Sequence, residues 1–121
     1  MPVKNILFVD DSPTERMFAV ELLTKAGYSV ITADSGEDGI AKAKANKPDL
    51  ILMDVVMPGL NGYQATRTLT RDDETRNIQV IVCTTKSQET DRIWGLRQGA
   101  ADYVVKPVNP EDLLKKIAAL P

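Results

Sequence analysis

The stretch that decides the fold is LILMDVVMPG, residues 50–59, in which four apolar residues lead into an aspartate and then a proline. An almost continuous apolar run of this length is typical of a strand that is covered on both faces of a parallel sheet. Four more runs of strand-like composition are spaced along the chain, at residues 6–9, 29–33, 79–83 and 102–105. Helix-like segments separate them, so the sequence predicts an α/β fold with an open, doubly wound parallel sheet.

The helix boundaries carry clear signals. Hydroxyl or amide side chains that can cap a helix precede four of the helix-like segments, namely Ser12, Ser35, Asn61 and Asn109. Gly27 and Gly99 lie where helices need a left-handed residue in order to stop. The segments between the strands are therefore predicted to be helices.

Composition limits the possible functions. The chain has 121 residues, a net charge of −2, one cysteine and no histidine. The slightly acidic balance argues against nucleic acid or an anionic membrane as the main partner, and the apolar runs are too short to cross a bilayer. We expect one cytoplasmic domain over residues 1–121, with no effector domain and no membrane insertion. Chemistry based on histidine is excluded.

Polar side chains stand at the carboxyl ends of the predicted strands. They are Asp10, Asp11, Asp54, Thr84 and Lys106. Right-handed crossovers place these strand ends along one edge of the sheet, where ligands of such folds bind. Three carboxylates that converge repel one another unless a cation compensates them, and an all-oxygen set suits Mg²⁺. The lysine then supplies a fixed positive charge for a phosphoryl oxygen.

Several motifs resemble the signatures of response regulator receiver domains, in the order and spacing of that family. They are FVDD at 8–11, MDVVMPG at 53–59, CTT at 83–85, GAADY at 99–103 and VKP at 105–107. The resemblance implies a flavodoxin-like (βα)5 fold with strand order 2-1-3-4-5, in a single-domain, chemotaxis-regulator-like protein. Within the family, DSPTE at 11–15 and MPGLNGYQATR at 57–67 are similar to PilH-type regulators of twitching motility.

The resemblance also implies a role for each matching residue. Asp54 is the expected phosphoryl acceptor, and Lys106 and Thr84 are expected to contact the phosphoryl group. Thr84 and Tyr103 are the expected switch pair, and Lys106-Pro107 resembles the cis peptide of the family. The expected Mg²⁺ ligands are Asp10, Asp11, Asp54 and the backbone carbonyl of Val56; Asp11 is expected to bind the ion directly and Asp10 mainly through water.

These roles imply a signalling switch rather than an enzyme. A histidine kinase or a phosphotransfer protein is the expected phosphoryl donor. A downstream protein is the expected target, bound through the face of the fourth helix, fifth strand and fifth helix, and the chain is expected to be a monomer. Three alternatives stay open: a small Mg²⁺-dependent aspartyl-phosphate phosphohydrolase, a phosphate sink without its own output, and a pseudo-receiver that binds partners unphosphorylated. Against the hydrolase, Asp10 and Asp11 are adjacent, whereas that class usually has D-x-D.

Residues 87–98 are predicted to form the fourth helix, with Ile93 and Leu96 on its buried side. Trp94 then lies off that stripe, and we expect it to be exposed and to bind a partner, together with Tyr103. Tyr63 is expected on a solvated helix face. The apolar Val56, the larger Thr85 and the basic Lys86 predict slow autodephosphorylation and slow phosphorylation by small donors.

Overall fold

The structure, a computed structural model, describes residues 3–85 and 88–120. Within these residues, five parallel strands form one sheet in the order β2-β1-β3-β4-β5. The strands are β1 (Asn5–Val9), β2 (Ser29–Ala33), β3 (Leu50–Asp54), β4 (Gln79–Thr84) and β5 (Asp102–Val105). The helices are α1 (Pro13–Lys25), α2 (Gly36–Asn46), α3 (Gly62–Arg71), α4 (Glu89–Arg97) and α5 (Pro110–Ala118). The predicted strand order and element sequence are confirmed.

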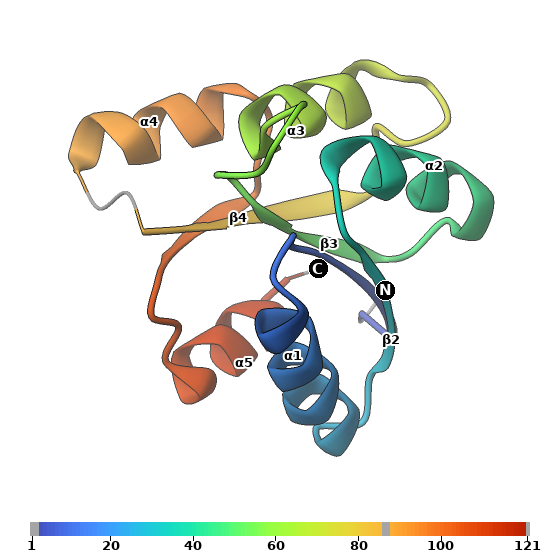
Figure 1. Ribbon diagram of the computed structural model, residues 1–121, viewed down its shortest axis with the longest axis vertical. Coiled ribbons are helices and arrows are strands. Elements are labelled where there is room, and N and C mark those ends of the chain that lie inside the picture. Colours follow the sequence, from blue (N-terminus) through green and yellow to red (C-terminus); the bar gives the residue numbers. More distant parts are fainter. Residues whose placement is uncertain (1–2, 86–87, 121) are drawn as a thin grey trace.

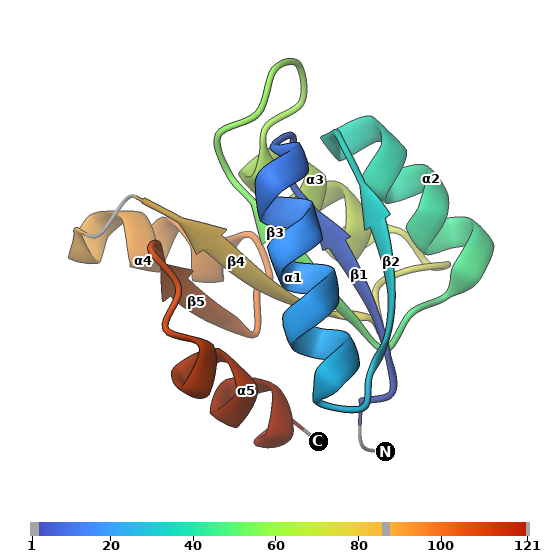
Figure 2. The ribbon, with the colours of Figure 1, turned by 60° about the horizontal axis from the view of Figure 1, so that its bottom comes forward.

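Helices cover both faces of the sheet. Helices α1 and α5 lie on one face, and α2, α3 and α4 lie on the other (Figure 1). All residues of the central strand β3 are buried, as its unbroken apolar run predicts. Each face has its own apolar cluster, one around Leu7, Ile51 and Val82 and the other around Phe8, Leu52 and Ile81. The strands run in the same direction, so their carboxyl ends share one edge (Figure 2).

The predicted capping residues begin their helices. Each of the four side chains accepts a hydrogen bond from a backbone N–H in the first turn, and Asn61 completes a capping box with Gln64. Gly27 and Gly99 adopt φ values of 99° and 103°, the left-handed conformation expected where helices stop. None of the helices among the described residues has the length and apolar character needed to cross a membrane.

One prediction about α4 is wrong. Leu96 packs against the core as expected, but Ile93 is 42% exposed. The only fully buried residue of the helix is Gly95, and α4 rests on the sheet through its backbone at that point. A glycine adds no hydrophobicity to a sequence pattern, so the pattern placed the buried side on the neighbouring apolar residues. The predicted start of the helix at Ser87 lies outside the described residues.

Candidate functional site

The sheet brings the predicted polar residues to one edge. Asp10 directly follows β1, Asp54 is the last residue of β3, Thr84 is the last residue of β4, and Lys106 directly follows β5. The strand pairs β1–β3 and β3–β4 run side by side up to these positions. The backbone N–H of Lys106 donates to the carbonyl of Thr84 at 2.7 Å, which fixes the start of the lysine-bearing loop. The predicted convergence is confirmed.

Lys106 links two of the carboxylates. Its Nζ donates to Asp10 Oδ2 at 2.8 Å and to Asp54 Oδ1 at 3.1 Å. The side chains of Asp10 and Asp54 are only 2% and 10% exposed, and that of Lys106 is 14% exposed. Charges this far removed from water must be paired or coordinated, so the lysine compensates part of the negative charge.

Asp10 is held rigidly, whereas Asp11 reaches into solvent. Asp10 Oδ1 accepts a bond from the backbone N–H of Ser12 at 3.0 Å, and the Asp10 carbonyl accepts one from the Arg16 guanidinium at 2.9 Å. One carboxylate oxygen of each of Asp10, Asp11 and Asp54 lies within 4.8 Å of the others. The cluster thus has a fixed buried side and an open side.

The electrostatics leave this cluster with excess negative charge. Burial raises the pKa of Asp54 above its ordinary value, and the neighbouring Asp10 charge raises it further, against the opposing effect of Lys106. Burial lowers the pKa of Lys106, but its hydrogen bonds to Asp10 and Asp54 outweigh burial and the pKa rises overall. One ammonium group therefore faces three carboxylates. This all-oxygen donor set fits a hard divalent cation such as Mg²⁺.

The loop after Asp54 packs closely against the backbone of the site. The Gly62 N–H donates to the carbonyl of Val55 at 2.9 Å, and a Cβ atom at Gly62 would lie 2.0 Å from the carbonyl oxygen of Asp54. Only glycine fits there. Val56, two residues after Asp54, is 62% exposed.

Tyr63 is a residue whose position was predicted wrongly. Instead of lying on a solvated face, it packs against the core, and its hydroxyl lies 3.3 Å from that of Tyr103. Tyr103 itself is 5% exposed, so its ring does not reach the surface in this structure. Thr84 is buried on β4, the strand that pairs with β5. The residue before it, Cys83, is paired with Val104, the residue after Tyr103. No repeat or motif in the sequence marks two tyrosines 40 residues apart as partners.

The fourth helix and fifth strand present apolar side chains to solvent. Trp94 is 51% exposed, which confirms the prediction about its exposure, while a role in partner binding stays a prediction. Ile93 and Val105 are 42% and 43% exposed. Lys86, which was expected to slow autodephosphorylation, lies outside the described residues. The cis peptide expected at Lys106-Pro107 is present.

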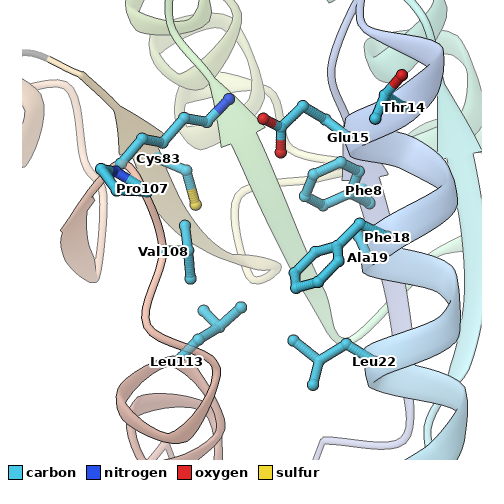
Figure 3. Close-up of a pocket in the computed structure, with 11 residues that line it drawn as sticks. Phe8, Thr14, Glu15, Phe18, Ala19, Leu22, Cys83, Pro107, Val108 and Leu113 are labelled. Carbon is cyan, nitrogen blue, oxygen red and sulfur yellow. The ribbon is translucent and has the colours of Figure 1, made fainter.

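A mostly apolar pocket of about 320 Å³ lies between α1 and α5, next to the acidic cluster. Phe18 and Leu22 of α1 face Val108 and Leu113 across it, and Glu15 stands at the end nearer the site (Figure 3). Lys106 contributes to the pocket wall as well as to the cluster. The site and the pocket are therefore neighbours that share one residue.

Comparison with known proteins gives a consistent result. The sequence profile described as "Response regulator receiver domain" matches residues 6–118. The chain belongs to the response regulator receiver domain family. It is 59% identical over 115 residues to Protein PilH of Pseudomonas aeruginosa, and the match covers 95% of each chain. Several longer relatives are matched over about half of their length.

Solved structures of receiver proteins share the whole fold. The chemotaxis protein CheY4 of Vibrio cholerae superposes with a TM-score of 0.89 at 33% identity, over 95% of this chain and 96% of that one. A chain of the CheX-CheY-BeF3-Mg+2 complex from Borrelia burgdorferi superposes with a TM-score of 0.89 at 27% identity, over 94% of this chain and 86% of that one. The receiver domain described here thus acts in phosphorylation-dependent signalling of two-component systems.

Proposed function

We propose that this receiver domain accepts a phosphoryl group on Asp54 from a phosphohistidine of a histidine kinase or phosphotransfer protein. A carboxylate oxygen of Asp54 forms the new bond to phosphorus as the P–N bond to histidine breaks, so the phosphoryl group is transferred and no water is consumed. The observation that carries the proposal is the double hydrogen bond of Lys106 to Asp10 and Asp54 at the open acidic edge.

The residues around Asp54 suit phosphoryl transfer. Such transfer depends mainly on positioning and on neutralising charge, because the carboxylate needs little activation. Lys106 is already within hydrogen-bond distance of Asp54 and can follow an incoming phosphoryl oxygen. Asp10, Asp11 and Asp54, with the backbone carbonyl of Val56, would hold Mg²⁺. When bound, Mg²⁺ neutralises charge on the transferring phosphoryl oxygens.

We propose that phosphorylation changes the surface formed by α4, β5 and α5, and that the target protein binds to this surface. A phosphoryl group adds about −1.5 to −2 charges near Thr84. Thr84 turns its hydroxyl toward that group, and Tyr103 occupies the space beside it. The exposed Trp94 then contacts the target protein. Its exposure of 51%, with the neighbouring Ile93 of α4 and Val105 of β5 also exposed, supports this assignment.

The biological context is proposed from the relatives. Identity of 59% with PilH over almost the full length of both proteins supports a role in a chemotaxis-like pathway that controls twitching motility. The protein acts there as a switch with slow loss of the phosphoryl group. The exposed apolar side chain of Val56 supports slow loss, because it cannot hydrogen-bond an attacking water.

Incubation with Mg²⁺ and acetyl phosphate or beryllofluoride tests the proposal. We expect stoichiometric modification of the wild type, measured by mass spectrometry for the phosphoryl group, and none of Asp54→Ala. Asp49→Ala is the matched control, since Asp49 is also an aspartate but its carboxylate binds the backbone N–H groups of Lys4 and Asn5, outside the acidic cluster. Steady release of phosphate would support a phosphohydrolase instead, and no modification would support a pseudo-receiver.

A second experiment separates output from phosphorylation. Trp94→Ala is expected to weaken binding of the beryllofluoride-loaded protein to its target, while the extent of Asp54 phosphorylation is unchanged. Equal loss of both would contradict the proposed role of Trp94. A loaded protein that changes no partner's activity, although it takes phosphoryl groups from the kinase, would identify a phosphate sink.

A further inference from the structure

Helix α4 is weakly attached to the rest of the domain. Its N-cap residue, Gln88, makes no side-chain capping bond, and Ile93 and Trp94 are exposed. Of its residues only Gly95 is fully buried, with Leu96 partly buried against the core. A helix with so few buried apolar contacts moves at low cost in free energy. Whatever lies beneath Gly95 therefore has a large influence on where the helix sits.

Two tyrosine rings lie beneath Gly95. A Cβ atom at Gly95 would be 2.9 Å from Tyr103 Cδ2 and 3.2 Å from Tyr63 Cε1. Both distances are shorter than ordinary carbon contacts, so the helix backbone rests directly on the rings. Tyr63 comes from α3 and Tyr103 from β5. The rings thus join three elements at the point where α4 is held.

The hydroxyl groups extend this contact to the backbone of α4. The Tyr63 hydroxyl donates to the carbonyl of Asp91, in the first turn of α4, at 3.4 Å. It lies 3.3 Å from the Tyr103 hydroxyl, which must be the donor of that bond when Tyr63 donates to Asp91. Burial raises the pKa of Tyr103, and the hydrogen bond with Tyr63 raises it further, so its hydroxyl keeps the proton that it donates.

We propose that Tyr63 is a positioning residue for the switch, which holds the Tyr103 ring in its buried place and ties that ring to helix α4. The Tyr103 ring cannot leave its buried place without breaking its hydrogen bond to Tyr63 and removing the support under Gly95. The inference rests on the proposed function, because it assigns the buried place of Tyr103 to the form that carries a phosphoryl group on Asp54. Loss of the Tyr63 hydroxyl then weakens that form.

Loss of the Tyr63 hydroxyl is expected to weaken the affinity for beryllofluoride only modestly. Both hydroxyl distances are long for O–H···O bonds, so each bond contributes at the low end of the usual range. Tyr63→Phe keeps the ring and removes only the hydroxyl. We expect it to weaken binding of beryllofluoride with Mg²⁺ roughly twofold to fivefold. The emission of Trp94, the only tryptophan and the neighbour of Gly95, reports the titration.

Two further variants sharpen the test. Tyr28→Phe makes the same chemical change in the apolar cluster on the opposite face of the sheet, and we expect it to titrate as the wild type does. Gly95→Ala keeps the Tyr63 hydroxyl but pushes the helix off the rings. Alanine favours a helix over glycine by about 1 kcal/mol. This gain partly offsets the cost of crowding the rings, so we expect Gly95→Ala to weaken the beryllofluoride response by more than its loss of thermal stability accounts for.

Hydrogen exchange separates this inference from the proposed function. In the protein without beryllofluoride, the amides of α4 should exchange faster in Tyr63→Phe than in the wild type and in Tyr28→Phe. Equal α4 exchange in Tyr63→Phe and the wild type would overturn the inference whether or not beryllofluoride binds. An unchanged or tighter beryllofluoride affinity of Tyr63→Phe would overturn it as well. A wild type that never responds to beryllofluoride would refute the proposed function itself.

Discussion

Replacing Asp54 by asparagine is expected to stabilise the domain in the absence of divalent cations. Burial and the Asp10 charge raise the pKa of Asp54 in the folded protein. A carboxyl whose pKa is raised by folding binds its proton more tightly in the native state, so its ionisation at neutral pH opposes folding. The Asp54→Asn substitution removes that charge with little change of shape. Its stabilising effect should therefore be present at pH 7 and disappear as the pH falls below the unfolded-state pKa of about 3.9.

Magnesium should reverse the order of stability of the wild type and the Asp54→Asn variant. A ligand at 100 times its Kd stabilises the native state by about 2.7 kcal/mol. In a domain of this size, each kcal/mol moves the Tm by about 4 °C, so the wild type should gain about 11 °C. Asp54→Asn lacks one of the three carboxylates within 4.8 Å and should gain much less. The asparagine variant is thus the more stable protein in EDTA and the less stable one in saturating Mg²⁺.

Thermal unfolding followed by circular dichroism, with EDTA or with a Mg²⁺ series, measures both effects. Asp49→Asn is the control, because hydrogen bonds from the backbone of Asn5 and Lys4 lower the pKa of Asp49. That variant should lose stability at pH 7 and keep the full Mg²⁺ response. Equal Mg²⁺ shifts in the wild type and Asp54→Asn would refute the assignment of Asp54 to the metal site. A lower Tm for Asp54→Asn in EDTA would refute the charge argument.

Three further changes have definite expected outcomes. Lys106→Met leaves the buried Asp10 carboxylate without its cation and should lower the free energy of unfolding by about 3 kcal/mol in urea titrations at pH 7. Gly62→Ala should cost about 2 kcal/mol or more in the same assay, since its Cβ would lie 2.0 Å from a carbonyl oxygen. Burial raises the pKa of the Cys83 thiol to about 12, so a disulfide reagent at pH 8 should modify it only after unfolding; rapid modification of the native protein would contradict this.

The sequence predicts the sheet and the acidic cluster for the same reason. The central strands of a doubly wound sheet are marked by nearly unbroken apolar runs, and the polar residues that end the strands meet at one edge. Asp10, Asp54 and Lys106 could therefore be placed together although they are far apart in the chain. The predicted helix starts at Ser12 and Asn61 were correct because capping is a local interaction.

The contacts of α4 could not be predicted in this way. They depend on which surface of the helix faces the sheet, and Gly95 determines that surface through the absence of a side chain. Periodicity assigned the buried side to Ile93, which is exposed. Tyr63 was placed in solvent because a tyrosine on a helix is amphipathic, and only the three-dimensional arrangement reveals Tyr103 beside it.

The bond between Lys106 and Asp10 joins residues that are 96 positions apart in the chain. Strands β1, β3, β4 and β5 must lie side by side before the ammonium group of Lys106 reaches the carboxylates. A polypeptide whose last strand is not in place has Asp54 but lacks the counter-charge of Lys106 beside it. On the proposed function, competence to accept a phosphoryl group therefore depends on the last strand, and a copy in which β5 is not in place lacks the ammonium group that phosphoryl transfer needs.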